Sequence, residues 1–79
     1  MFYFNLDNGA INLDQVGIDL PDLAAARAEA VSTLADRLCD SNVSSLLRGK
    51  PWRLWVTNQP GGKGITLFDV QITATDGVS

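Results

Sequence analysis

Alternating apolar and polar residues predict a β-hairpin at the start of the chain. Residues 2–7 alternate along FYFNLD, and the Asn8-Gly9 pair that follows is typical of a two-residue type I′ turn. Such a turn would pair Leu6 with Ile11 and Phe4 with Leu13. This register predicts one apolar face and one polar face; the apolar face holds Phe2, Phe4, Leu6, Ile11 and Leu13, and the polar face holds Tyr3, Asn5, Asp7, Ala10, Asn12 and Asp14.

A helix is predicted after the loop at residues 15–17. Pro21 and Asp22 mark its start, because the Asp22 carboxylate can accept a hydrogen bond from a first-turn amide. Apolar residues then recur every three or four positions, which is the spacing of one helix face, at Leu23, Ala26, Ala30, Leu34 and Leu38. The small alanines favour close approach to a sheet. The segment VSSLLRG adds a final turn before Gly49 and Pro51 stop the helix.

A second hairpin is predicted from residues 52–72. Residues 52–57 alternate as a half-buried strand, the NQPGGKG segment has turn chemistry, and residues 65–72 form the last strand. Two registers remain open. In one, Val56 pairs with Ile65, which buries Ile65 and Leu67. In the other, shifted by one, Arg53 lies opposite Asp69 and the buried residues are Phe68, Val70 and Ile72; a bulge could satisfy both.

These elements predict one α+β domain over residues 1–79, with an ordered core at about residues 2–72 and a frayed tail from residue 73. The element order is ββαββ. We expect a four-stranded antiparallel sheet with the helix packed on one face, since two layers are the simplest way to bury two half-apolar hairpins and one amphipathic helix. The order of the hairpins in the sheet stays open.

Arg27 interrupts the apolar side of the helix. It lies only about 40° from the centre of the stripe at 100° per residue, so its stem should cover apolar surface while its guanidinium finds a carboxylate. We expect Asp14 or Asp19 as that partner, because Asp22 already caps the helix. The pair would tie the first hairpin to the helix and hold the loop at Gly17. The alternative role for Arg27 is binding of an anion or a partner.

Charge and composition narrow the environment and the partners. The net charge of −3 disfavours a broad grip on nucleic acid or anionic lipid, which is mediated mainly by Lys and Arg. No apolar run approaches the ~20 residues of a membrane span, no secretory leader precedes residue 20, and the single Cys39 cannot form a disulfide within the chain. We therefore expect a cytoplasmic protein that does not enter a membrane.

Candidate catalytic chemistry is scarce. The chain has no histidine, which removes the commonest general base and metal ligand. Cys39 is predicted as a packing residue near a helix C-terminus, and the acids at positions 14, 19 and 22 do not have calcium-loop spacing. The PGGKG segment lacks the spacing of a phosphate loop and leads into a strand. We predict no enzyme, no catalytic residues, no metal site and no cofactor.

An aromatic surface is the best candidate for function. Alternation puts Trp55 opposite the face of Trp52, Leu54 and Val56, where Trp55 with Tyr3 or Phe68 would form an exposed interface. A chain of 79 residues also has a small core that self-association would support. We therefore predict a non-catalytic protein-interaction domain and a homodimer. The alternative is a small regulatory, antitoxin-like or nucleic-acid-associated module that uses Arg48, Lys50 and Arg53.

Three segments resemble a family of small bacterial proteins of unknown function. They are the aromatic strand with its turn, FYFNLDNG, the segment LDQVGIDLPDLAAARAEA, and the strand WRLWVTNQPGG. The family pattern is an aromatic strand with Asp-Gly, then DxxGxxLPDLxxARxEA, then WxIxV or WxLxV. Its specific part matches here at Asp14, Gly17, Leu20, Pro21, Asp22, Leu23, Ala26, Arg27, Glu29 and Ala30.

The resemblance implies the fold and carries no established activity. Two departures matter. Family members often have histidine where this chain has Asn5, so a role of that imidazole would not exist here. They are commonly polar at the position of Trp55, which favours an outward direction for this side chain.

Overall fold

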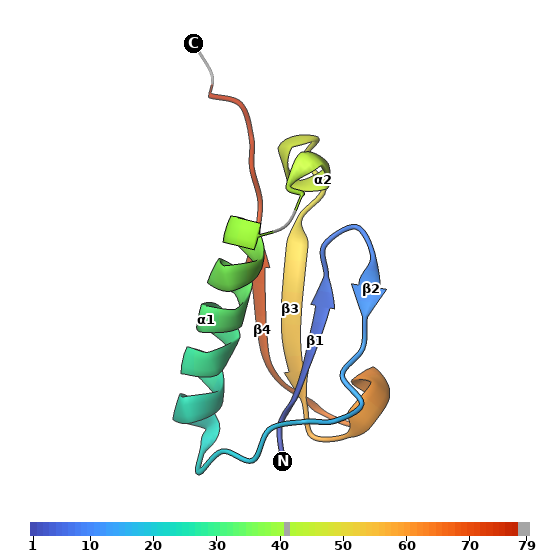
Figure 1. The fold of residues 1–79 in the computed structure, drawn as a ribbon, viewed down its shortest axis with the longest axis vertical. Coiled ribbons are helices and arrows are strands. Elements are labelled where there is room, and N and C mark those ends of the chain that lie inside the picture. Colours follow the sequence, from blue (N-terminus) through green and yellow to red (C-terminus); the bar gives the residue numbers. More distant parts are fainter. Residues whose placement is uncertain (41, 78–79) are drawn as a thin grey trace.

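The computed structural model describes residues 1–40 and 42–77 and has the predicted α+β architecture. Its strands are β1 (Tyr3–Asp7), β2 (Ile11–Asn12), β3 (Trp52–Thr57) and β4 (Thr66–Ile72). The helices are α1 (Leu23–Asp40), the short α2 (Ser44–Leu47) and the 3-10 turn η1 (Pro60–Gly62). The sheet has four strands, and α1 lies against β3 and β4 (Figure 1). The predicted fold class is confirmed. The expected tail has no helix or strand over residues 73–77, and residues 78 and 79 lie outside the described residues.

The two hairpins join through their aromatic strands. The strand order is β2-β1-β3-β4, with β1 antiparallel to β3, so β1 and β3 lie in the middle of the sheet. Both strands carry the largest apolar residues of their hairpins. In the centre of the sheet each of them has a neighbouring strand on both sides, which shields these residues from water. In the described part of the chain, no helix has the length and apolarity that crossing a membrane requires.

The predicted register of the first hairpin is wrong by one residue. Leu6 pairs with Asn12 and Asp7 pairs with Ile11, so three residues connect the strands instead of two. A type I′ turn needs positive φ at both central residues, but only Gly9 adopts it, at 102°. The Asp7 carboxylate instead accepts a hydrogen bond from the Gly9 amide at 3.2 Å. Phe2, Phe4 and Leu6 still pack on the core side, but Ile11 is 67% exposed and Leu13 is also exposed.

The second hairpin adopts neither of the two registers left open by the sequence, but it does bury the apolar set expected from the second one, because a further shift by two residues keeps the same side chains on the same face. Val56 pairs with Phe68, Leu54 with Val70 and Trp52 with Ile72, and a bulge shifts the register between Val56 and Thr57. Phe68, Val70 and Ile72 therefore face the helix, while Ile65 stays exposed. The expected strand pairing of Arg53 with Asp69 is wrong, because Asp69 lies directly opposite Trp55 and Arg53 lies opposite Gln71.

The core lies between α1 and the helix-facing side of β3. Ala26 and Ala30 of α1 are fully buried, and so are Trp52, Leu54 and Val56 of β3. The predicted stripe is confirmed, because Leu34 is buried and Leu38 packs against the same cluster. At one end, α2 closes the core with Leu46. The Ser45 hydroxyl accepts a hydrogen bond from the Trp52 indole nitrogen at 3.3 Å and donates one to the Asn8 carbonyl at 3.1 Å.

Candidate functional site

The side of the sheet opposite α1 has no covering α-helix in the described chain, but the 3-10 turn η1 packs on β1 and β3, and Asn5 and Thr57 are fully buried. We call this side the Trp55 face. It consists of the residues that alternate with the core positions on the three long strands: Tyr3, Asn5, Asp7, Arg53, Trp55, Thr57, Asp69 and Gln71. Trp55 lies at its centre, between Asn5 of β1 and Asp69 of β4. The predicted outward direction of Trp55 agrees with this register.

Arg53 and Asp69 hold the middle of the Trp55 face in place. The Arg53 guanidinium stacks on the Trp55 ring, with its carbon 4.4 Å from the ring centroid. Its Nε and Nη2 both donate to one Asp69 carboxylate oxygen, at 2.9 and 2.6 Å. This side-chain hydrogen bonding raises the pKa of Arg53 further above its ordinary value. The half-buried Trp55 therefore lies in a fixed polar frame with part of its indole ring exposed.

Asn5 organises the other end of the Trp55 face. Its side chain is fully buried, and the amide donates to the Thr57 hydroxyl and to the Trp55 carbonyl, both at 3.2 Å. The amide oxygen accepts a hydrogen bond from the Asp14 backbone at 3.0 Å. Among the described side chains, no buried nitrogen or oxygen atom lacks a partner. Asn5 therefore works inside the structure and is not available to a ligand.

The Asp14 carboxylate accepts a hydrogen bond from β1 where the backbone carbonyl of a neighbouring strand would otherwise do so. One carboxylate oxygen accepts the Phe4 amide at 3.0 Å, and the other accepts the amides of Val16 and Gly17 at 2.9 and 3.1 Å. Burial alone would raise the pKa of Asp14. The three backbone hydrogen bonds outweigh burial, and the pKa lies below the ordinary value of 3.8. Asp14 is therefore a structural acid that stays ionised.

The loop that follows Asp14 packs on Tyr3. Gly17 has φ of 78°, and a Cβ atom there would lie 2.7 Å from Cε1 of the Tyr3 ring. Beyond this contact, Phe2 and Ile18 exchange backbone hydrogen bonds at 2.9 and 2.8 Å. Tyr3 is thus partly covered by its own chain.

Phe68 does not belong to the predicted interface. It pairs with Val56 on the helix-facing side and packs against the core cluster, so it lies across the sheet from Trp55. Alternation alone leaves the register of β4 open and therefore allows Phe68 on either face of the sheet. Sequence reasoning also missed the role of Asn5, because a polar residue on an alternating strand is normally read as exposed.

The predicted ion pair of Arg27 is also absent. Arg27 is exposed, and its guanidinium carbon lies 5.9 Å from the centroid of the Phe68 ring. The ion pair found among the described residues joins Arg53 and Asp69. Arg27 lies over β4, whereas Asp14 lies beside β1 and already binds three amides. The expected capping role of Asp22 is confirmed, since its carboxylate accepts the Ala25 amide at 2.8 Å, with Pro21 exposed at the preceding bend.

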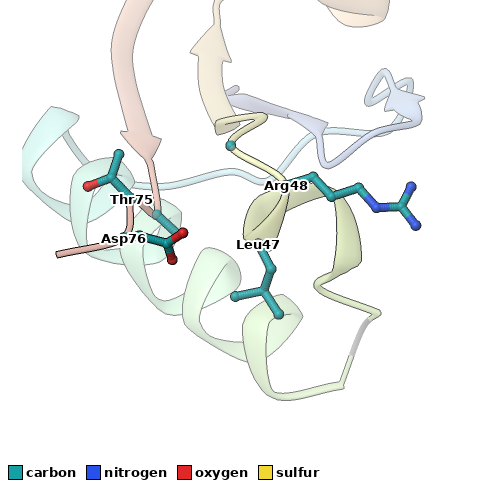
Figure 2. A pocket seen from close by; sticks show the side chains of 6 residues that line it. Leu47, Arg48, Thr75 and Asp76 are labelled. Carbon is teal, nitrogen blue, oxygen red and sulfur yellow. The ribbon is translucent and has the colours of Figure 1, made fainter. Parts of the chain in front are cut away.

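Three hollows on the described surface contain no constellation typical of catalysis. One, about 380 Å³, lies between the turn after β1 and α2, with Asn8, Ser44 and Arg48 in its lining. Another, about 390 Å³, lies between α2 and the segment after β4 and is lined by Leu47, Arg48, Gly49, Ala74, Thr75 and Asp76. In Figure 2 the Arg48 guanidinium points away from Asp76 and Thr75, so the two charges do not converge. The third, about 300 Å³, lies between α1 and β1, with Thr33 and Arg37 on the helix side. No group of three or more metal-ligating side chains occurs in residues 1–40 and 42–77.

Comparisons with known proteins assign the family and leave the function open. No curated protein and no solved structure matches the chain. A family model described as a domain of unknown function (DUF6894) matches residues 1–73, which include all four strands and both α-helices. The chain therefore belongs to the DUF6894 family.

Proposed function

We propose that this chain is a non-catalytic domain that binds a protein partner through the Trp55 face. The observation that carries the proposal is the position of Trp55 on the sheet face opposite α1, where no α-helix covers it in the described chain. Arg53 stacks on it, and Trp and Arg are the residue types that most often dominate binding energy at protein interfaces.

The frame around Trp55 favours a protein over a small molecule. Arg53 and Asp69 neutralise one another beside Trp55, and the face presents this ion pair together with the half-buried indole ring. Trp55 lines none of the hollows of about 300–390 Å³ on the described surface, whereas small-molecule sites are concave. A stable interface removes roughly 800 Å² from each partner, about 15% of the 5159 Å² accessible surface of this chain. That requires most of one face of a small domain.

The test is an affinity capture with a matched pair of variants. We expect a tagged wild-type chain to retain a protein partner, and Trp55→Ala to lose it, because the ring supplies the centre of the contact. Ile65→Ala is the control, since Ile65 is an apolar residue that is 65% exposed and lies outside the Trp55 face. Binding is then quantified with the purified partner by calorimetry.

The proposal is wrong if the partner binds Trp55→Ala and wild type with equal affinity. Circular dichroism of Trp55→Ala must match wild type, so that a loss of binding reports the surface and not the fold. Turnover of a substrate by the purified chain would contradict the non-catalytic part of the proposal.

The nucleic-acid alternative gains no specific observation from the described residues. Trp52, the aromatic residue within the basic cluster, is fully buried and cannot stack on a base. Arg53 is paired with Asp69, which leaves Arg48 and Lys50 exposed. Salt-dependent binding of RNA or DNA that Arg48→Ala weakens would favour this alternative over a protein partner.

A further inference from the structure

We propose that a second copy of this chain pairs with the outer edge of β4, so that two four-stranded sheets join into one sheet of eight strands. This inference goes beyond the proposed function, because it assigns self-association to a surface other than the Trp55 face. The outer edge of β4, from Thr66 to Ile72, is called the β4 edge below.

The β4 edge has backbone groups without strand partners. β4 is seven residues long and pairs only with β3 in the described chain. Natural edge strands usually block further pairing with proline, lysine, a bulge or extreme shortness. The stretch from Phe68 to Ile72 has neither proline nor lysine, and its pairing with β3 is regular. Its one charge, Asp69, is paired with Arg53 of the same chain.

The opposite edge of the sheet is blocked, which makes the β4 edge distinctive. β2 has only two residues. Beyond it, the Asp14 carboxylate occupies the Phe4 amide, and the chain bulges away before Ile18 pairs with Phe2. Two copies that each have one blocked edge and one open edge can join through their open edges. The combined sheet then has only blocked edges and cannot add a third copy. Association is therefore predicted to stop at a dimer.

The core is incompletely covered on the side of β4. Trp52, Leu54 and Val56 on β3 are fully buried, whereas their partners Ile72, Val70 and Phe68 on β4 are only partly buried, although both sets face α1. A second chain beside β4 would cover these three side chains and remove their exposed apolar surface from water.

One flank of α1 continues the apolar surface above the β4 edge. Thr33 and Arg37 line the hollow beside β1, whereas Arg27 lies over Phe68 of β4. One flank of α1 therefore lies toward β1, and the other flank lies toward the β4 edge. On the Arg27 flank, about 80–140° from the centre of the stripe, the exposed residues are small or apolar: Ala24, Ala28, Val31 and Ala35. Val31 is 55% exposed.

The geometry of a symmetric pair suits this flank. Neighbouring strands lie ~4.8 Å apart, so a helix above the gap between β3 and β4 lies about 4.8 Å from a twofold axis outside β4. The two α1 axes would then be about 10 Å apart, at the upper end of the 8–10 Å range of packed helices, and alanines permit such approach. The surface formed by the β4 edge and the flank of α1 above it measures roughly 24 by 20 Å, or about 500 Å² per chain. Two chains would together bury about 1,000 Å², which is the minimum for a biological interface.

Charge selects the register of the pair. A twofold axis at Asp69 would set two carboxylates directly opposite one another, which is unfavourable. An axis at Val70 sets Asp69 opposite Gln71 of the second copy and Phe68 opposite Ile72 of the second copy. In this register a carboxylate meets an amide, and the apolar residues meet on the side of the helices.

The first experiment measures mass and a charge exchange at Gln71. Sedimentation equilibrium in the micromolar range should give a species of twice the 8.5 kDa chain mass. Gln71→Glu places a second carboxylate opposite Asp69 of the second copy, at two symmetric positions, and should raise the dimer Kd about tenfold. Gln71→Lys places an ammonium group there, and its dimer should be at least as tight as that of wild type.

The second experiment compares two neighbouring helix positions. Val31→Lys puts a charge between the two helices and should give a monomer, whereas Ser32→Lys, on the outer side of the same turn, should leave the dimer intact. Both positions are exposed in the single chain, so both variants should retain the helical circular dichroism of wild type.

A monomeric wild type overturns the proposal. So does a dimer that persists in Val31→Lys, or one that responds equally to Gln71→Glu and Gln71→Lys. Trp55→Ala should leave the dimer unchanged. If Trp55→Ala dissociates it while Val31→Lys does not, self-association belongs to the Trp55 face and the β4 edge assignment is wrong. Loss of the protein partner without loss of the dimer would affect only the proposed function.

Discussion

Asp14 is the residue on which the outer side of the first hairpin depends. Its carboxylate accepts three backbone amides that would otherwise lack partners where β2 ends. Such charge-assisted bonds contribute about 1.5–3 kcal/mol each when they are sheltered from water. The residue was singled out from the sequence as one of a group of acids, but its partners are main-chain groups that no side-chain pattern reveals.

Acid should destabilise the chain through Asp14. Its pKa is below 3.8 when folded, so the unfolded state binds a proton more readily. The stability contributed by this carboxylate is complete above the unfolded pKa, and it is lost as the pH falls through the folded pKa. Urea unfolding at about pH 6 and about pH 3 should therefore show a smaller loss for Asp14→Asn than for wild type. Equal losses in the two proteins would show that other carboxylates cause the acid response.

Alanine substitutions at Gly49 and Gly17 distinguish two causes of lost stability: the strain of positive φ for a residue with a Cβ atom, and a steric clash of that atom. Gly49 has φ of 90° and open space around it, whereas a Cβ atom on Gly17 would lie 2.7 Å from the Tyr3 ring. Gly49→Ala should cost about 1–2 kcal/mol of unfolding free energy. Gly17→Ala should cost a further ~1–3 kcal/mol, because Tyr3 must move. Chemical denaturation measures both, and similar values would mean that the Tyr3 ring rearranges freely.

At the scale of the element, α1 follows its sequence pattern closely. Its buried residues recur at helical spacing, and Asp22 caps its first turn. These features depend only on local geometry. The partner of Arg27 depends on which strand lies beneath it, and the helix lies over β3 and β4. Arg27 therefore meets the Phe68 ring and not an acid of the first hairpin.

Arg27 should tolerate substitution better than an ion-paired arginine would. A cation over an aromatic ring at an exposed site contributes only about 0.5–1 kcal/mol. Arg27→Met should reduce the unfolding free energy by no more than that, and Arg27→Lys should be close to wild type. In the same thermal unfolding series, Asp22→Ala should cost about 1 kcal/mol through loss of the cap. A larger loss of unfolding free energy for Arg27→Lys than for Asp22→Ala would instead support the ion pair of Arg27 with a carboxylate that the sequence predicted.

At the scale of the whole molecule, the sheet order decides which surfaces are open. Placing β1 and β3 in the centre leaves β4 at one edge and the short β2 at the other. The single long helix then covers one face, and on the opposite face η1 packs on β1 and β3 while Trp55 stays only half-buried. Both proposals, a partner on the face and a second copy on the edge, follow from this arrangement.

The melting temperature should rise with protein concentration if the β4 edges pair. Association stabilises the folded state by mass action, so each tenfold increase in concentration shifts the folding equilibrium in favour of the dimer. Differential scanning calorimetry over a hundredfold dilution series should show this trend for wild type. Val31→Lys should melt at one temperature throughout the series. A wild-type melting temperature that does not change on dilution would contradict pairing.

The elements and the core faces of α1, β1 and β3 could be predicted from the sequence, because they depend on interactions within a few residues, whereas Ile11 and Leu13 beside β1 are exposed and not in the expected core. The α1 stripe, the Asp22 cap and the alternation of β3 need only the geometry of a helix or a strand. The turn after β1 marks the limit, since the Asp7 carboxylate and Gly9 together favour a three-residue connection over the expected Asn-Gly turn.

The tertiary structure decided the register, the neighbours and the open surfaces. Phe68 faces the helix because β4 aligns with β3 around a bulge, and Asn5 is buried because the loop at Asp14 folds over it. Residues far apart in the sequence set these contacts, and their energies depend on packing that no local pattern contains. The sequence alone therefore determined that Trp55 lies opposite the core, and only the assembled sheet determined which residues surround it and which edge stays free.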